Sequence, residues 1–377
     1  MRLENKRPIR VAHIIGKLTA GGVEAVVYNY YKNIDHSRFQ FDFFYDKDSP
    51  FTPPKELVEL GANFYPIPSY KNIFSYIGSL VRLFKKNKYL IVHSNMNTLS
   101  PFSLYAAKLS GVPVRIIHNH STAGKGEFKK NCLKYALKPF AKCFATKYCA
   151  CGNYAGKWLF GKKTFDSGKI TVFKNAIDLT KFKFNEDIRK KVRHELNVED
   201  KLVVGHIGRF CKQKNHEFLI KVFEKIHELK HNSVLVLVGV GELEEEIKNL
   251  VHQKKLDDCV KFLGKRNDCN ELYQAMDVFV LPSNYEGLVV VGIEAQSIGL
   301  PCIFSTSVAE ETKISPNVKF LSLEDSSEKW AKEAIELSKL GIAKDNTYAS
   351  DHGYDIKKEA FKLVEFYNEC IDEYKNQ

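Results

Sequence analysis

Apolar segments of strand length alternate with amphipathic segments of helix length along almost the whole chain. Such alternation places successive strands parallel in one sheet, with helices covering both of its faces. A polar stretch at 178–187 interrupts the alternation, which then restarts. The sequence therefore predicts an α/β protein with two Rossmann-like, doubly wound domains.

The predicted strands are 9–15, 39–45, 90–94, 114–118 and 170–173 in the first half, and 202–207, 234–239, 260–263, 278–281 and 302–305 in the second. Helices are predicted at 22–33, 72–86, 99–109, 128–144, 326–339 and 354–374.

The length of 377 residues and a hydrophobic content of 44 % are enough to give each domain its own core. No window approaches the roughly 18–20 consecutive apolar residues that a membrane-spanning helix requires. The first ten residues lead directly into a strand without a cleavable signal pattern, which predicts a cytoplasmic protein. Nine cysteines at irregular spacings, with one close pair at Cys149 and Cys151, favour reduced thiols over a zinc site. We therefore expect neither a metal nor a cofactor.

The net charge of +12 is distributed very unevenly. Residues 1–180 contain 28 Lys and Arg against 11 Asp and Glu, whereas residues 181–377 contain 29 against 34. Between residues 60 and 165 a single acid, Glu127, is set against 17 basic residues. This asymmetry suggests an anionic partner for the first half, which is either nucleic acid or membrane lipid.

Two glutamates, Glu286 and Glu294, follow the strand predicted at 278–281. The sequence between them predicts a tight turn and then a helix, with Glu286 in the turn and Glu294 in the helix. The turn presents the free amides of Gly287 and Leu288 at a helix start, where phosphate or sugar oxygens bind. Carboxylates at both ends of such a site could accept hydrogen bonds from sugar and ribose hydroxyls, which favours a nucleotide-sugar. The alternative is a solvated turn residue and a partly exposed helix residue, but the apolar neighbours of Glu294 make an unpartnered carboxylate costly there.

Basic side chains lie in two further loops at predicted strand ends. Arg209 and Lys214 follow the strand at 202–207 and could together neutralise a diphosphate leaving group without a metal ion. Arg266 follows the strand at 260–263, in a loop suited to recognising a nucleotide base. Ligands of doubly wound folds bind at the carboxyl ends of the strands, so a binding role and an ordinary solvated loop are both open interpretations of these residues.

The corresponding loops of the first half contain glycines and histidines. Gly21 and Gly22 open a predicted helix and allow a phosphate to approach the backbone closely. They lack the G-x-G-x-x-G spacing of dinucleotide-binding proteins, which weighs against a nicotinamide-dependent oxidoreductase. His118 and His120 lie at the end of a predicted strand. We expect His120 to emerge at the edge of the sheet as a catalytic candidate, although either imidazole could take that place.

Four motifs together identify a family. They are Gly21-Gly22, Gly208-Arg209-Phe210 with Lys214-Asn215, Gly239-x-Gly241-Glu242, and Glu286 through Glu294, which fits an E-x7-E element. On these residues the chain resembles glycosyltransferase family 4, the retaining nucleotide-sugar transferases with two Rossmann-like domains (the GT-B fold). The similarity is most specific over 202–305 and looser in the first half. It implies an acceptor-binding domain at 1–180, a nucleotide-sugar-binding domain at 181–350, and a C-terminal helix at 351–377 that packs back on the first domain.

The resemblance also implies roles for the residues of the second half. Arg209 and Lys214 would hold the donor diphosphate, and Glu294 the donor ribose. Glu286 and the turn amides that follow it would hold the transferred sugar. In the implied reaction an acceptor hydroxyl attacks the anomeric carbon on the face that the diphosphate leaves, and a leaving phosphate oxygen takes the proton.

In the first half, the resemblance implies that Gly22 approaches the phosphate from the opposite domain across a cleft. His120 would lie beside the sugar and the acceptor. Asp46 and Asp48 mimic the D-x-D metal-binding sequence of a different glycosyltransferase architecture, and we interpret them as a surface turn.

Two segments of the first half, 70–88 and 128–147, combine apolar stripes with basic residues. Such helices can lie on an anionic membrane surface, but their apolar faces could equally belong to the core. We therefore expect a peripheral enzyme on the inner face of the cell membrane. Its donor would be a UDP-sugar and its acceptor a lipid-linked oligosaccharide, as in capsule, exopolysaccharide or O-antigen assembly, with no nucleic acid partner. The alternatives are a sugar-nucleotide epimerase of the same architecture and a basic nucleic-acid-binding protein.

Overall fold

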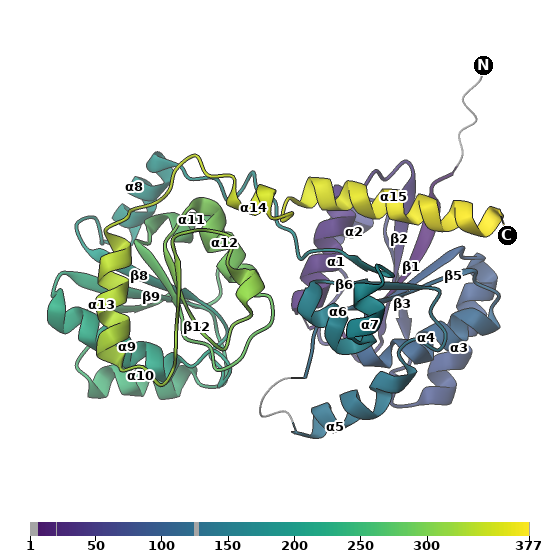
Figure 1. Cartoon of the computed structure of the whole chain (residues 1–377), viewed down its shortest axis with the longest axis horizontal. Coiled ribbons are helices and arrows are strands. Elements are labelled where there is room, and N and C mark those ends of the chain that lie inside the picture. The colour runs from purple at the N-terminus through teal and green to yellow at the C-terminus, as the bar shows by residue number, and fades with distance from the viewer. Residues whose placement is uncertain (1–6, 20, 124–127, 377) are drawn as a thin grey trace, which may run out of the picture. The chain divides into compact units, whose positions relative to one another are not determined.

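The structure is a computed structural model that describes residues 7–19, 21–123 and 128–376, without the side chains of 128–130. The chain forms two compact units (Figure 1). Unit 1 comprises Met1–Ile177 with Asp355–Gln377, and unit 2 comprises Asp178–Tyr354. Each unit is built on one parallel sheet, so the predicted fold class of two Rossmann-like domains is confirmed.

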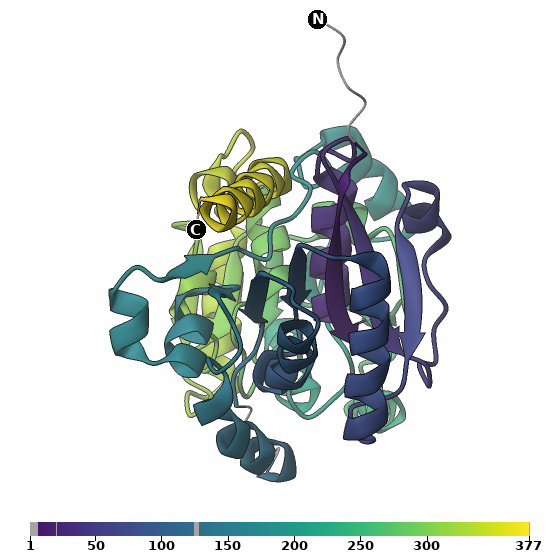
Figure 2. The same ribbon diagram turned by 90° about the vertical axis from the view of Figure 1, so that its right-hand side faces the viewer.

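A seven-stranded sheet in the order β3-β2-β1-β4-β5-β6-β7 forms the centre of unit 1. Its strands alternate between two cores because helices cover both faces (Figure 2). Val11 of the first strand belongs to one core and Ala12 to the other. The strands are β1 (Ile9–Gly16), β2 (Phe39–Asp46), β3 (Asn63–Ile67), β4 (Ile91–Ser94), β5 (Val114–Asn119), β6 (Lys147–Ala150) and β7 (Ile170–Val172). The helices are α1 (Gly22–Asn33), α2 (Lys55–Glu59), α3 (Ile73–Asn87), α4 (Ser100–Leu109), α5 (Phe128–Leu137), α6 (Asn153–Phe160) and α7 (Lys162–Asp166).

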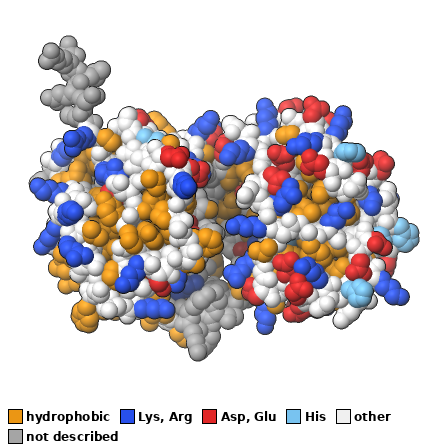
Figure 3. Space-filling model, turned by 180° about the vertical axis from the view of Figure 1, so that it is seen from behind, with side chains coloured by type: hydrophobic (Ala, Val, Ile, Leu, Met, Phe, Trp, Pro, Cys, Tyr) orange, Lys and Arg blue, Asp and Glu red, His pale blue; other side chains and the backbone are white. Residues whose placement is uncertain are grey.

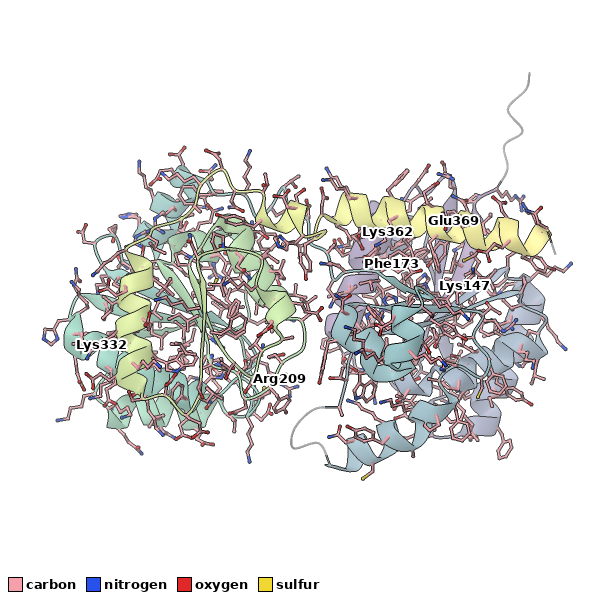
Figure 4. The ribbon with its side chains drawn as sticks, in the orientation of Figure 1. Lys147, Phe173, Arg209, Lys332, Lys362 and Glu369 are labelled. Atoms are coloured by element: carbon pink, nitrogen blue, oxygen red, sulfur yellow. The ribbon has the colours of Figure 1, made fainter. Side chains whose placement is uncertain are left out.

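The last helix, α15 (Ile356–Lys375), completes unit 1 although it follows unit 2 in the chain. Its apolar face lies in the same core as β1 and α1, where Leu363 and Tyr367 are buried. Lys362 on its flank donates to the carbonyl of Val172 at 2.7 Å and lies over the ring of Phe173 (Figure 4). The predicted C-terminal helix that returns to the first domain is therefore confirmed.

Unit 2 contains a six-stranded parallel sheet in the order β10-β9-β8-β11-β12-β13. Its largest buried side chain is that of Trp330, which packs among the aliphatic residues of one core. The strands are β8 (Leu202–Ile207), β9 (Ser233–Val238), β10 (Val260–Phe262), β11 (Val278–Leu281), β12 (Cys302–Ser305) and β13 (Val318–Leu321). The helices are α8 (Glu186–Glu195), α9 (His216–Leu229), α10 (Glu244–Gln253), α11 (Cys269–Ala275), α12 (Val290–Ile298), α13 (Ser327–Ser338) and α14 (Tyr348–Asp351).

The structure corrects the sequence prediction in several elements. Strands β3, β6 and β13, of four or five residues each, are absent from the prediction. The helix predicted at 128–144 ends at Leu137 and gives way to a single 3-10 turn that contains Pro139. Proline has no backbone N–H to continue an α-helix, which explains the break.

The apolar stripe of α3 belongs to the core, since Tyr76, Leu80 and Phe84 are buried. The apolar face of 70–88 is therefore not free to contact a membrane. Phe74, at the start of the helix, is nevertheless 87 % exposed. Within the described part of the chain, each helix is too short or too polar to traverse a bilayer. Acidic side chains are abundant on unit 2 in Figure 3, whereas unit 1 shows mainly basic and hydrophobic ones on that face.

Candidate functional site

The loop between β8 and α9 carries both predicted phosphate-binding cations. Arg209 is largely exposed, with 72 % of its side chain accessible, and forms an ion pair with Glu242 at 3.0 Å (Figure 4). Lys214 is mostly buried, and its Nζ lies 2.6 Å from Oε1 of Glu286. The structure thus brings Lys214 together with one predicted carboxylate, while Arg209 remains open to solvent.

The two glycines of the β9–α10 turn, Gly239 and Gly241, allow that turn to pack closely against the loop that carries Arg209. A Cβ at Gly239 would lie 2.1 Å from the carbonyl oxygen of Gly208. A Cβ at Gly241 would lie 2.3 Å from the carbonyl oxygen of Phe210. Glycine is required at both positions because backbone meets backbone there. The Gly-x-Gly sequence therefore supports the Arg209 loop from its neighbouring turn.

Glu286 lies in the turn between β11 and α12, and its backbone N–H donates to the carbonyl of Ser307 at 3.1 Å. Helix α12 begins at Val290, so Gly287 and Leu288 lie in the turn just before it. No atom lies within 4 Å of the position that a Cβ would take at Gly287. The turn is therefore open at Gly287, the residue that follows Glu286.

Glu294 lies within α12 and is partly exposed. Burial raises the pKa of its carboxyl group, and a hydrogen bond from the hydroxyl of Tyr273 opposes that rise. The Tyr273 hydroxyl lies 2.9 Å from Oε2 of Glu294. Tyr273 comes from α11, and sequence reasoning did not identify it, because one tyrosine in a short helix carries no distinctive signal. It orients the Glu294 carboxylate.

Arg266 lies in the loop before α11 and pairs with Asp268, whose Oδ1 is 2.8 Å from its Nε. This pairing raises the pKa of Arg266 and lowers that of Asp268. The guanidinium is thus held at the start of a helix of unit 2, and its contact with a nucleotide base stays a prediction. Among the described residues, no group of three His, Cys, Asp or Glu side chains is arranged as metal ligands.

In unit 1, the glycine loop between β1 and α1 is fixed by a buried carboxylate. Glu24 accepts hydrogen bonds from the backbone N–H groups of Thr19 and Gly21, both at 2.7 Å. Gly21 caps α1, and a Cβ at Gly22 would meet no atom within 4 Å. The loop is therefore held from inside by Glu24 and is open at Gly22, the position expected to approach a phosphate.

His118 in β5 and His120, which follows the last residue of that strand, differ in their surroundings. His118 is buried within the sheet, and its Nδ1 lies 3.1 Å from Nε2 of His93. His120 is partly exposed, and its Nε2 lies 3.0 Å from Oδ1 of Asn95. Burial lowers the pKa of His120 to about 3, so its imidazole is neutral near pH 7. A neutral imidazole can position a substrate by hydrogen bonding or packing but supplies no cationic acid.

His120 belongs to a chain of hydrogen bonds that reaches α15. Tyr367 hydroxyl lies 2.7 Å from Nδ1 of His93 and 3.1 Å from Nε2 of His13. His13 in turn lies 3.3 Å from the amide of Asn95, which contacts His120. These histidines line a cavity of about 20 Å³, the size of one water molecule. Sequence reasoning missed this chain because its members come from four distant segments.

The Asp46–Asp48 segment is only in part the surface turn that we predicted. Asp48 is exposed and pairs with Lys17 at 2.9 Å. Asp46, however, is buried at the end of β2, and burial raises its pKa.

Comparisons with known proteins match both halves of the chain. The family described as Glycosyl transferases group 1 matches residues 187–352, and the family described as Glycosyltransferase Family 4 matches residues 20–181. EpsF of Bacillus subtilis is 33 % identical over 374 residues, which cover 97 % of each chain. The UDP-Gal:alpha-D-GlcNAc-diphosphoundecaprenol alpha-1,3-galactosyltransferase of Escherichia coli is 32 % identical over 311 residues, 79 % of each chain.

Solved structures show the same fold at lower identity. HepE of Anabaena in complex with UDP is 19 % identical, with a TM-score of 0.71 over 98 % of this chain and 100 % of its own. The strand-end motifs of both units and a relative that is 33 % identical along nearly the entire chain lead to one assignment. The protein is a member of glycosyltransferase family 4.

Proposed function

We propose that this protein is a retaining glycosyltransferase that moves a sugar from a UDP-sugar to a lipid-linked oligosaccharide in bacterial surface polysaccharide synthesis. The observation that carries this proposal is the contact of Lys214 with Glu286, because it brings a phosphate-binding cation and a hydroxyl-binding carboxylate to one strand edge. The name of the Escherichia coli relative gives UDP-Gal as donor and a diphosphoundecaprenol-linked sugar as acceptor, which supports these substrate classes.

In the proposed reaction the bond between the acceptor oxygen and the anomeric carbon forms while the bond from that carbon to the diphosphate breaks. The bonding electrons pass to the leaving phosphate oxygen, which also takes the proton of the acceptor hydroxyl. Arg209 and Lys214 stabilise the negative charge that develops on the diphosphate. Glu286 and Glu294 hold the sugar and ribose hydroxyls and so fix the donor for attack on one face.

The proposal is tested by incubating the protein with a panel of nucleotide-sugars and a synthetic undecaprenyl-diphosphate-linked sugar, followed by mass spectrometry and NMR of the products. We expect the acceptor to gain one sugar whose anomeric configuration matches that of the donor. An inverted product would contradict the retaining mechanism. Conversion of the nucleotide-sugar without any acceptor would favour the epimerase alternative.

Replacing Glu294 with glutamine is expected to weaken the binding of UDP by about 5- to 30-fold, because a charge-assisted hydrogen bond to the ribose is lost. Calorimetry with the full chain measures this change. Tyr273→Phe should weaken binding less, since the carboxylate stays and loses only the hydroxyl that orients it. Unchanged affinity in Glu294→Gln would contradict the ribose assignment.

Transfer activity is expected to survive an excess of EDTA, because cationic side chains and the turn amides would neutralise the diphosphate. The measurement is the initial rate with and without chelator. A complete loss of activity that Mg²⁺ or Mn²⁺ restores would show that the phosphate site needs a divalent ion.

A membrane surface for unit 1 is proposed at α5 and the turn after it. The exposed apolar side chains there are Leu133, Tyr135 and Phe140, each about half accessible. Lys138 lies over the ring of Trp158 at 5.0 Å, so its charge is held beside this apolar surface. Apolar side chains flanked by lysines are suited to the interface of an anionic bilayer. Lys129 and Lys130, which belong to the same predicted segment, have side chains outside the described residues.

Co-sedimentation with vesicles is expected to rise with anionic lipid content and to fall with added salt. Lys142, two residues after Phe140, is also exposed. Changing both Lys138 and Lys142 to glutamate should lower the bound fraction by at least about tenfold, since each basic residue near the surface contributes about 1 kcal/mol. The matched control changes Lys332 and Lys339, which are exposed on unit 2, to glutamate. Equal binding to neutral and anionic vesicles would contradict the proposed surface.

A further inference from the structure

Lys214 and Glu286 form an ion pair that is largely shielded from water. The accessible fractions of their side chains are 14 % and 12 %, and their charged atoms lie 2.6 Å apart. Breaking such a pair without a substitute partner leaves a poorly solvated charge, which is strongly unfavourable. The Arg209–Glu242 pair in the same region is different, because both of its side chains are more than half exposed. Lys214 therefore differs from Arg209 in that its ion pair is shielded from water.

The two loops that carry this pair are also joined through their backbones. Asn284 donates its N–H to the carbonyl of Gln213 at 2.8 Å and its side-chain amide to the carbonyl of Lys212 at 2.6 Å. Gln213 donates its side-chain amide to the carbonyl of Tyr285 at 3.1 Å. These three bonds fix the spacing of the two loops, so the backbones of Lys214 and Glu286 stay close together while the flexible Lys214 side chain can still reorient. An incoming ligand must meet both groups together.

The imidazoles around Lys214 add no charge of their own. Burial lowers the pKa of His206 well below its usual value, and burial together with Lys214 lowers that of His216 to about 4. Both rings are thus neutral near pH 7. His206 and His216 therefore supply no second cation beside Lys214. Any anion that binds there competes with Glu286 for the Lys214 ammonium.

We propose that Lys214 is shared in turn by Glu286 and the donor diphosphate. This proposal rests on the proposed function and deepens it. When a nucleotide-sugar binds, the diphosphate takes the Lys214 ammonium, and the released Glu286 carboxylate accepts hydrogen bonds from the hydroxyls of the transferred sugar. Both charges keep partners throughout, so the exchange leaves neither group stranded.

The same exchange discriminates between donor and product. After transfer, the nucleoside diphosphate remains without its sugar, so Glu286 has lost the hydroxyls that replaced Lys214. The carboxylate then competes for the ammonium again and lowers the affinity for the product. The pair therefore favours binding of the intact nucleotide-sugar and release of the nucleoside diphosphate.

The test is calorimetric titration of the full chain with UDP and with UDP-galactose. In Glu286→Gln the competing carboxylate is removed while the shape of the side chain is kept. We expect the Kd for UDP to fall by about three- to tenfold, as for removal of a like charge near a bound anion, whereas the Kd for UDP-galactose changes by less than about twofold or rises. Turnover of the variant should fall, since the sugar loses its carboxylate acceptor.

The matched control is Glu224→Gln, which removes one negative charge from a half-buried ion pair elsewhere in unit 2. Glu224 pairs with Lys254 at 2.7 Å. We expect the Kd for UDP to stay within about 1.5-fold of the wild type, because a distant charge is screened. Equal tightening in both variants would mean a general charge effect and would overturn the proposal.

The outcomes distinguish failure of the proposed donor from failure of the shared Lys214 cation. Failure of the wild-type protein to bind either UDP or UDP-galactose would overturn the proposed donor, whatever the variants do. If the wild type binds UDP and Glu286→Gln binds UDP with equal or lower affinity, the shared cation is overturned and the proposed function is kept. An equal fall in the Kd for UDP and for UDP-galactose in Glu286→Gln would also overturn the shared cation, because the transferred sugar would then gain nothing from hydrogen bonds to the Glu286 carboxylate.

Discussion

Replacing Lys214 with alanine is expected to slow sugar transfer by about 30- to 1000-fold, which corresponds to about 2–4 kcal/mol of lost transition-state stabilisation. The ammonium would no longer stabilise the departing diphosphate, and the shielded Glu286 carboxylate would lose its partner at 2.6 Å. The slowing in Arg209→Ala should lie toward the lower end of the same range, because this side chain is largely exposed. Initial rates at saturating donor and acceptor measure both effects.

The control for this prediction is Lys212→Ala, two residues before Lys214. Its side chain is exposed, and only its backbone carbonyl takes part in the contact with Asn284. We expect its rate to stay within about threefold of the wild type, as for most exposed substitutions. A rate for Lys214→Ala that matches this control would rule out the diphosphate assignment.

Substituting alanine for Gly241 is expected to destabilise unit 2 by about 2–4 kcal/mol. The new Cβ would lie 2.3 Å from the carbonyl oxygen and 2.6 Å from the nitrogen of Phe210, and backbone atoms cannot rotate away as a side chain can. The displaced residue adjoins Arg209, so transfer activity should fall as well. Urea unfolding followed by the fluorescence of Trp330, in a Trp158→Phe background, measures the stability of unit 2 alone.

The control for this substitution is Gly292→Ala in α12. Its Cβ would lie 3.0 Å from the ring of Phe304 and 3.1 Å from the methyl of Thr312, which are longer contacts than those at Gly241 and are to side chains rather than backbone. Alanine also favours a helix over glycine by about 1 kcal/mol, which offsets the crowding. We expect a net change within about 1 kcal/mol. A Gly241→Ala protein as stable as this control would contradict the tight support of the Arg209 loop.

The alternation of strands and helices predicted the fold class because long apolar runs such as those of β1, β8 and β9 are buried on both faces. The strands that the prediction missed are short or carry polar residues. β3 contains Pro66 and lies at the edge of its sheet, and β6 begins with Lys147, which pairs with Glu373 of α15. Their pairing depends on neighbours that are distant in sequence, and no local pattern reveals such neighbours.

The candidate site could be predicted in its chemistry but not in its contacts. Residue type and strand-end position were sufficient to single out Arg209, Lys214, Glu286 and Glu294. That Lys214 pairs with Glu286 follows from the adjacency of β8 and β11 and from the bonds of Asn284, which only the folded unit displays. Tyr273 and Glu24 were not predicted either, because each acts only through hydrogen bonds to residues of its own unit, Glu294 and Gly21 respectively.

The place of α15 in unit 1 has a consequence for how the protein is made. The first 177 residues leave the ribosome long before the segment Asp355–Gln377 is made, yet the core around β1 and α1 includes Ile356, Leu363 and Tyr367. At about 5–20 residues per second, the nascent first half waits tens of seconds with an uncovered apolar face while unit 2 is translated and folds. Unit 1 can close only when translation has reached the end of α15, so a chain interrupted earlier keeps that face exposed to chaperones and proteases.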